Sequence, residues 1–259
     1  HPALARRRRV DGERVDAAGE LFDDYSQDHP MTPHQDRLNR LQRMSFISSE
    51  QRMVLGSESV AAWAAPVVHF SHGTHSVHND ILWELMKDKT RFGGWWPRER
   101  PAIFFRPARV EPDFAKAKYD PAYRLPLFQA AFHESVVTTD RWELSPVKFP
   151  ALVQIRELIE LLYNVPSIWS LDLLQLRKHA GRLAAHHRFF TAIHRRVGHE
   201  PLSEFRWLTS DRRVQQTRFG DHVVLTANFT EEDYGSVASW CIEARWLNEG
   251  RTELYCPQP

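Results

Sequence analysis

The sequence predicts an α/β protein, a partial (β/α)8 TIM-type barrel followed by an antiparallel β region. Short apolar runs that end in polar residues alternate with amphipathic stretches as far as Glu200, which is typical of strands and helices in a barrel. Beyond Glu200, short alternating segments flank glycines, which is typical of antiparallel strands. We expect the apolar run Leu127–Phe132 to be a buried strand. The polar residues His133, Glu134 and Ser135 come directly after it, as at the active-site edge, or rim, of a barrel, where polar side chains follow the strands.

Composition limits the classes of function. The formal net charge is +1 over 259 residues, so no overall field favours nucleic acid as a partner. No apolar run is long enough to span a bilayer, and a membrane is not an expected partner. The chain begins at His1 without a signal-peptide pattern, so its localisation (cytoplasmic, periplasmic or secreted) stays open.

The amino-terminal part predicts a linker and the start of a barrel. Residues 1–20 include a basic run with few apolar neighbours and are expected to be unstructured. Leu21–Phe22 is a weak strand candidate that ends at Asp23 and Asp24. We place the barrel part at residues 21–200 and a separate antiparallel β region at residues 201–259.

A helix and two strands are expected next. Thr32 is a candidate N-cap, followed by Pro33 and by Gln35, which completes a capping box. Leucines then recur at helical spacing. The strand Met53–Leu55 ends in Gly56, Ser57 and Glu58, and Val67–Phe70 is a further strand candidate. Strand, helix and strand in this order predict one βαβ unit with a carboxylate after each strand.

The second half shows stronger periodicity. Leu152–Tyr163 is an amphipathic helix, Val165–Leu171 a strand candidate, and Asp172 caps a long helix that Gly198 ends. A hairpin is expected where two alternating segments meet at Gly220-Asp221, with further strands in the segments 237–247 and 252–255. Cys241 and Cys256 can pair, but their spacing does not decide this, and neither is expected to be catalytic.

Two carboxylates are the main candidates for chemistry. Asp23 and Glu58 follow successive predicted strands, so they are expected at one edge of the sheet. Such a pair can flank a glycosidic bond, with one group ionised and the other kept protonated. Because most Asp and Glu side chains are simply solvated surface groups, the pair alone is weak evidence.

Four histidines suggest an alternative site. His69, His72, His75 and His78 recur every third residue, and imidazoles can bind zinc or copper. On a helix this spacing drifts around the axis, and in a loop it fixes no geometry. We therefore expect no metal and no cofactor, and favour a contact between His72 and a sugar.

The ordered segments LFDDYSQDHP, VLGSE, VVHFSHG, RLPLFQAAFHESVVTTDRW and VQQTRFGDHVVLTANF resemble the endo-α-N-acetylgalactosaminidase superfamily, glycoside hydrolase families 101 and 129 and their relatives. The resemblance implies a bacterial enzyme in which a barrel precedes a β-sandwich. It implies that Asp23 is the nucleophile and Glu58 the acid/base. It also places Asp24, Tyr25 and the pair His133–Glu134 at the substrate, although Glu134 stands where aspartate is commoner.

Aromatic side chains complete the predicted substrate contacts. Trp95 and Trp96 lie in a long aromatic-rich connection, and Trp142 follows the predicted rim. A flat aromatic face matches the apolar face of a pyranose, although core packing explains such residues about equally well. The expected ligand is therefore a carbohydrate.

The number of strands leaves two functions open. A full barrel has eight strands, and the sequence supplies about five before residue 200. The predicted function is a retaining glycosidase for α-linked sugars that lacks activity alone through truncation, with a missing N-terminal half or a second copy as partner. The alternative is a non-catalytic carbohydrate-binding or interaction protein derived from such an enzyme.

Overall fold

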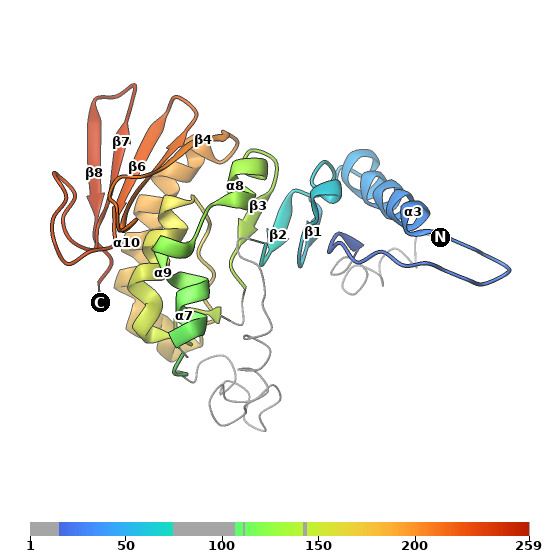
Figure 1. The fold of residues 1–259 in the computed structure, drawn as a ribbon, viewed down its shortest axis with the longest axis horizontal. Helices are drawn as coiled ribbons and strands as arrows, with labels where there is room; N and C mark the ends of the chain where they lie inside the picture. The colour runs from blue at the N-terminus through green and yellow to red at the C-terminus, as the bar shows by residue number, and fades with distance from the viewer. Residues whose placement is uncertain (1–15, 75–106, 111, 142–143, 259) are drawn as a thin grey trace. The chain divides into compact units, whose positions relative to one another are not determined.

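The computed structural model describes residues 16–74, 107–110, 112–141 and 144–258 (Figure 1). They form two compact units. The first comprises the chain up to Thr74 together with Ser135–Thr138, and the second comprises His75–Glu134 and Thr139–Pro259. No helix in the described ranges is long and apolar enough to cross a membrane.

Helix α3 (Pro33–Ser45) organises the first unit, and a π-helical turn, η1 (Phe46–Glu50), continues it. Its start confirms the predicted capping box. The Gln35 backbone N–H donates to Thr32 Oγ1 at 3.3 Å, and the Thr32 N–H donates to Gln35 Oε1 at 2.8 Å. These two bonds satisfy donors that a helix start otherwise leaves without a partner.

A small sheet completes this unit, with strand order β1-β2-β3. Strands β1 (Gly56–Ser57) and β2 (Phe70–His72) run parallel, with a 3-10 turn, η2 (Ala62–Ala64), between them, and β3 spans Val137–Thr139. The predicted strand Met53–Leu55 was wrong, because β1 covers the two residues after it, and the predicted strand Val67–Phe70 overlaps β2 only at Phe70. Met53 and Val54 instead lie exposed before β1.

The predicted strand at Leu21–Phe22 was wrong. Phe22 is 58% exposed, and its backbone N–H donates to a side chain, Asp36 Oδ2, at 3.3 Å rather than to a strand. The nearest β contact is an isolated antiparallel bridge between Asp24 and Met31. The predicted βαβ unit therefore lacks its first strand in the described part of the chain.

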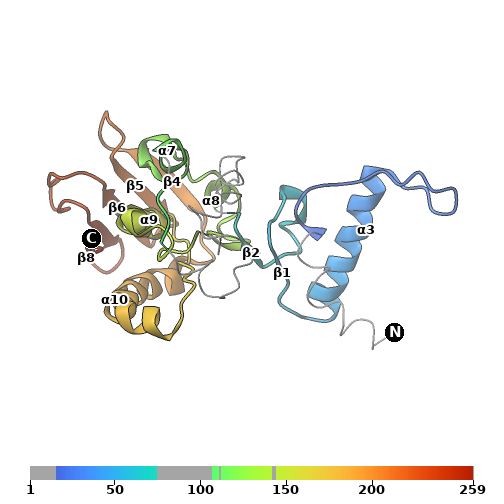
Figure 2. The same ribbon diagram turned by 90° about the horizontal axis from the view of Figure 1, so that it is seen from below.

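The second unit consists of helices and one antiparallel sheet (Figure 2). Its helices are α7 (Pro112–Tyr119), α8 (Leu127–Phe132), α9 (Val153–Leu162) and α10 (Leu173–Val197), with 3-10 turns η3 (Pro121–Tyr123) and η5 (Pro150–Leu152). The predicted helices α9 and α10 are confirmed. The Gln175 N–H donates to Asp172 Oδ1 at 2.7 Å, so Asp172 caps α10 as expected.

Two predicted strands of this unit are not strands. Leu127–Phe132 is the helix α8, in which the Ala130 N–H donates to the Pro126 carbonyl at 2.8 Å. A short apolar run suits either structure, and here Pro126 starts a helix that leaves Leu127 71% exposed. The segment 165–171 is irregular, and the Ser170 N–H donates to the Ser145 side chain rather than to a neighbouring strand.

The five-stranded sheet runs β4-β5-β6-β7-β8, with every neighbouring pair antiparallel. The predicted hairpin at Gly220-Asp221 is confirmed. Gly220 has φ +49°, in the left-handed region that favours glycine. The strands are β4 (Leu202–Trp207), β5 (Val214–Phe219), β6 (Val223–Asn228), β7 (Ile242–Trp246) and β8 (Arg251–Tyr255).

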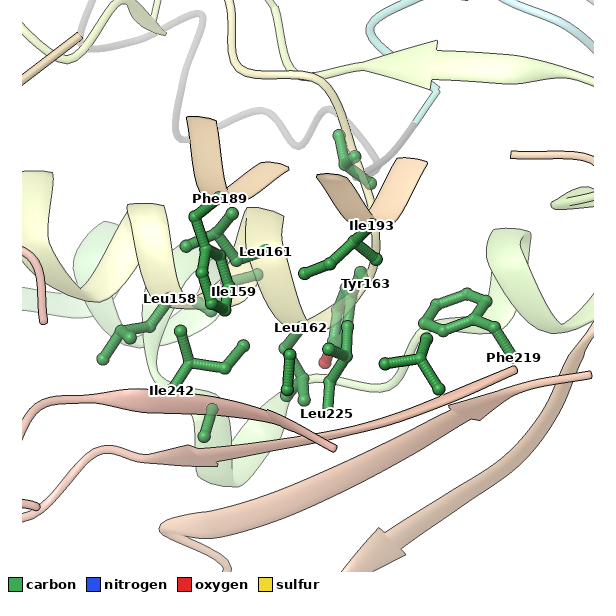
Figure 3. Packing of buried hydrophobic residues seen from close by; sticks show 14 of the residues in the cluster. Leu158, Ile159, Leu161, Leu162, Tyr163, Phe189, Ile193, Phe219, Leu225 and Ile242 are labelled. Carbon is green, nitrogen blue, oxygen red and sulfur yellow. The ribbon is translucent and has the colours of Figure 1, made fainter. Parts of the chain in front are cut away.

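One hydrophobic core joins this sheet to α9 and α10 (Figure 3). Alternate strand residues face the helices, and the core includes Leu158, Leu162, Phe189, Ile193, Phe219, Leu225 and Ile242. In the described ranges the sheet is single, and helices cover this face. The predicted β-sandwich is therefore wrong for this region, because the apolar faces of α9 and α10 occupy the place of a second sheet. Residues before and after Glu200 therefore belong to the same hydrophobic core.

The structure also shows how the two cysteines pair. Cys241 and Cys256 form a disulfide between the residue before β7 and the residue after β8. Sequence spacing had left this pairing open. The bond closes the last hairpin of the sheet.

Candidate functional site

Glu58 lies where the parallel strands of the first unit end. Gly56 pairs with Phe70 and Ser57 with Ser71, so Glu58 follows β1 at the edge where His72 ends β2. Glu58 is half-buried, and beyond it the Val60 N–H donates to Thr74 Oγ1 at 3.1 Å. The carboxyl ends of parallel strands are where α/β enzymes place their reactive groups. Glu58 thus follows a strand, although that strand is Gly56–Ser57 and not the predicted Met53–Leu55.

Asp23 lies exposed in an irregular segment that α3 anchors. The residue before it, Phe22, donates its N–H to Asp36 Oδ2. Asp36 in turn accepts hydrogen bonds from Arg40 Nε at 2.9 Å and Nη2 at 2.7 Å, and the Arg40 hydrogen bonds lower the pKa of Asp36. A buried ion pair thus fixes the backbone next to Asp23, although no strand does so.

A closed loop follows Asp23. Asp24 and Met31 exchange two backbone hydrogen bonds of 2.7 and 2.9 Å. Inside the loop, the Asp24 carboxylate accepts from the Ser26 N–H at 2.9 Å and contacts His29 Nδ1 at 2.8 Å, and these partners, Ser26 first, lower the Asp24 pKa. Tyr25 is 87% exposed. Asp24 therefore holds the loop together, while the ring of Tyr25 is accessible to a ligand.

The remaining histidines have different surroundings. His69 Nδ1 accepts the Leu55 N–H at 3.2 Å, which ties the segments that precede β1 and β2. His75 and His78 lie outside the described residues. Within the described ranges, no three His, Cys, Asp or Glu side chains form a group that could hold a metal ion.

His133 and Glu134 follow α8 in the second unit, with His133 as the C-cap residue. The His133 ring is 6% exposed, and its nitrogens face the Glu200 carbonyl oxygen at 2.6 Å and Asn164 Oδ1 at 3.3 Å. Glu134 is exposed. These contacts give His133 a structural role, and the substrate contacts of both residues stay predictions. Trp95, Trp96 and Trp142 lie outside the described residues.

A buried charge cluster was missed by the sequence interpretation. Asp140 directly follows β3 and is 1% exposed, and its two oxygens lie 3.4 Å from Lys118 Nζ and 3.4 Å from Arg156 Nη2. Arg156 Nε also contacts Glu160 Oε1 at 2.9 Å. Burial lowers the pKa of Lys118 and raises that of Glu160. The available signal was Arg156 and Glu160 at i,i+4 on a helix, but it resembles an ordinary surface pair.

A second missed group joins α9, α10 and β8. Glu157 is fully buried, and its carboxylate accepts from the Tyr255 hydroxyl at 2.8 Å and from Arg182 Nε. His186 Nδ1 lies 3.8 Å away. Burial raises the pKa of Glu157, but its contacts with His186 and Arg182 outweigh burial, and the net pKa is lowered. The partners are far apart in sequence, so local patterns could not reveal them.

Comparison with known proteins gives a family and a fold. The sequence model described as "Glycosyl hydrolases related to GH101 family, GH129" matches residues 13–218. No curated protein matches the chain. Two solved structures of α-N-acetylgalactosaminidase NagBb from Bifidobacterium bifidum are similar at 17% identity. The Gal-NHAc-DNJ complex (TM-score 0.51) aligns with 85% of this chain and 30% of its own, and the ligand-free form (TM-score 0.50) with 84% and 29%.

Proposed function

The chain belongs to the glycosyl hydrolases of family GH129, which are related to GH101, and we propose that it supplies the catalytic carboxylates of a retaining α-glycosidase. Asp23 is the nucleophile and Glu58 the acid/base. The observation that carries the proposal is that the family match spans both residues, while Glu58 follows the first strand of a parallel pair.

The proposed reaction has two steps. Asp23 attacks the anomeric carbon, the bond from that carbon to the leaving oxygen breaks, and Glu58 gives its proton to this oxygen. Water then attacks the glycosyl–aspartate ester, Glu58 takes a proton from the water, and Asp23 leaves as a carboxylate. Two inversions give net retention. The mechanism requires carboxyl groups roughly 5–5.5 Å apart.

The proposed scaffold is part of a (β/α) barrel. The strand order β1-β2-β3 follows the chain order, and β1 and β2 are parallel, as in successive barrel strands. The similar solved structures support a glycosidase fold at the level of backbone arrangement. Their length supports the proposal that further barrel strands complete the site, since this chain spans 30% of the longer protein.

The proposed substrate is an α-linked N-acetylgalactosaminide. The similar structures carry the name α-N-acetylgalactosaminidase, and this is the basis for the choice of sugar. Tyr25 is the best-supported contact, because its ring is exposed two residues after the proposed nucleophile. Further proposed contacts are Asp24, His72, Trp95, Trp96, His133, Glu134 and Trp142.

The chain alone is proposed to be weakly active or inactive. The sheet of a complete barrel is closed and has no edge strands. In the first unit, by contrast, β1 is an edge strand of the three-stranded sheet. Asp23 is exposed, and a misplacement of about 1 Å can cost on the order of a hundredfold in rate. The proposed partner is a missing N-terminal half of the barrel or a second copy. The exposure of Asp23 also favours a second candidate, a carbohydrate-binding protein without catalysis.

The test compares residues 1–259 with the product of the full reading frame that encodes them. Both are offered nitrophenyl α-glycosides, including the N-acetylgalactosaminide, as wild type and as Asp23→Asn and Glu58→Gln. Asp28→Asn is the matched control, because Asp28 is an exposed carboxylate in the same loop.

We expect turnover by the full product, little by residues 1–259, and loss in both variants but not in the control. Proton NMR of the first-formed product is expected to show the α-anomer. Turnover that survives both substitutions would refute the assigned residues. Sugar binding without turnover by the full product would favour the non-catalytic candidate, and robust turnover by residues 1–259 would refute the need for a partner.

A further inference from the structure

Four segments of the second unit meet at two histidines and an asparagine. His133 lies at the end of α8, Asn164 follows α9, His194 belongs to α10, and Glu200 precedes β4. Asn164 is 3% exposed, and its Oδ1 position lies 2.6 Å from His194 Nδ1 and 3.3 Å from His133 Nε2. His133 Nδ1 lies 2.6 Å from the Glu200 carbonyl oxygen.

Hydrogen-bond chemistry restricts the protons in this cluster. A carbonyl oxygen only accepts, so His133 Nδ1 must carry a proton. If the Asn164 oxygen faced both rings, His133 Nε2 would also need a proton, and the buried ring would be a cation. In that orientation the Asn164 Nδ2 group is buried with no hydrogen-bond partner.

Rotating the Asn164 amide by 180° resolves this conflict. The two orientations have almost the same shape, so the hydrogen-bond network must decide between them. With Nδ2 toward the rings, one N–H donates to His133 Nε2 and the other to His194 Nδ1, and both imidazoles are neutral. The position without a partner then holds a carbonyl oxygen, which is better tolerated than an unpaired donor.

The surroundings also favour neutral rings. Burial lowers the pKa of His133 more strongly than the Glu200 carbonyl, the Asn164 side chain, the Glu134 carboxylate and the Asn164 backbone raise it. Burial, His133 and His199 lower the pKa of His194. The rings also pack on Phe219, at a centroid distance of 4.6 Å from His133, and on Phe190, at 4.9 Å from His194. The Glu200 carboxylate contacts another histidine, His222, whose Nε2 lies 3.5 Å from Oε1.

We propose that His133, Asn164 and His194 form a pH-sensitive latch that fastens the end of α8 and the segment before β4 to α9 and α10. When both imidazoles are neutral, the Asn164 amide bridges them and the latch is closed. Protonation of either ring places an N–H against the amide N–H, and the bridge can then re-form only if the amide rotates and leaves its Nδ2 group buried without a partner. The latch does not rest on the proposed reaction, which assigns the chemistry to Asp23 and Glu58, although His133 is also a proposed sugar contact.

The direction of the pH dependence follows from proton binding. The unfolded chain has histidines with pKa values near about 6.5, and those of the folded latch are lower, so the folded state binds fewer protons. The contribution of the latch is therefore fully present above about pH 6.5. It is lost as the pH falls through that value toward the folded pKa values.

The decisive variant is Asn164→Asp. Asn164 has φ +53°, and Asp, like Asn, tolerates this left-handed conformation, so the change preserves shape and backbone. A carboxylate can only accept, and it therefore favours protonated rings on both sides. The control is Asn39→Asp, an exposed asparagine of α3 that makes the same change in charge.

The measurements are NMR titrations of the histidine C2–H signals and urea unfolding between pH 5.5 and 7.5. In the wild type, we expect His133 and His194 to titrate below about pH 6.5 and the unfolding midpoint to fall on acidification. In Asn164→Asp, the titration midpoints of His133 and His194 should rise by about one pH unit or more. The loss of stability on acidification should then shrink or reverse.

A wild-type His133 that titrates above about pH 6.5 would overturn the proposal, because the amide oxygen would then face the rings. Equal titrations in Asn164→Asp and wild type would also overturn it. The wild-type titration needs no variant, so it decides the question even if Asn164→Asp does not fold.

Discussion

The candidate catalytic carboxylates of the first unit and two carboxylates of the second unit lie in opposite surroundings. In the first unit, Asp23 is exposed and Glu58 half-buried, next to strands of only two and three residues. In the second unit, Glu157 and Glu160 are fully buried among cations, beneath a five-stranded sheet. Exposed carboxylates can meet a ligand, whereas buried paired ones hold elements together. Residue type alone therefore does not distinguish a candidate reactive carboxylate from a structural one, but the degree of burial does.

The largest expected effect comes from breaking a buried pair. Glu157→Gln removes the charge that Arg182 and the Tyr255 hydroxyl contact, and it leaves a cation buried without its partner. We expect the free energy of unfolding to fall by about 3–5 kcal/mol in urea titrations. The control is Glu249→Gln, since Glu249 forms partly exposed pairs with Arg196 and Arg251 and should change stability by less than about 1 kcal/mol. Equal effects would remove the proposed distinction between buried and exposed carboxylates.

The next effect tests whether the sheet and helices share one core. Leu225 on β6 is fully buried in that core, and Leu225→Ala should cost about 2–5 kcal/mol of unfolding free energy. Leu254 on β8 is 49% exposed and supplies the same substitution on the solvent side, with a cost expected below about 1 kcal/mol. Calorimetric melting of both variants measures the difference. A small loss of unfolding free energy for Leu225→Ala would mean that the helices do not pack closely against this face of the sheet.

The smallest expected effect concerns the segment that carries Asp23. Asp36→Asn replaces the carboxylate that accepts from the Phe22 N–H and from Arg40. Because a hydrogen bond to a charged group is stronger than one to a neutral group, we expect Phe22 amide exchange to accelerate on the order of tenfold. Exchange in β6 should stay unchanged, since that strand belongs to the other unit. An unchanged rate at Phe22 would show that the ion pair does not restrain the Asp23 segment.

Local chemistry made part of this structure predictable. The capping box at Thr32, the cap at Asp172 and the turn at Gly220 depend on residues within a few positions of one another, and all three are confirmed. The run Leu127–Phe132 failed because a short apolar segment suits either period, and its helix depends on Pro126.

The candidate site was less accessible to sequence reasoning. Glu58 does follow a strand, but that strand is Gly56–Ser57 and not the apolar run Met53–Leu55 from which it was predicted. Asp23 could not be placed, since its segment depends on Asp36, thirteen positions later in α3. The contact between His133 and Asn164 joins residues 31 positions apart, and only the folded chain brings them together.

The disulfide determines how a mechanical load would travel through the sheet. Cys256 follows β8 directly, and its bond to Cys241 leads to the residue before β7. A force on the chain after Cys256 therefore divides between a covalent bond and the hydrogen bonds of β8. Strand β8 therefore cannot separate from β7 one hydrogen bond at a time, starting at its carboxyl end. Tyr255, which reaches Glu157 on α9, is held at the anchored end, so the contact between sheet and helix is protected from strain applied there.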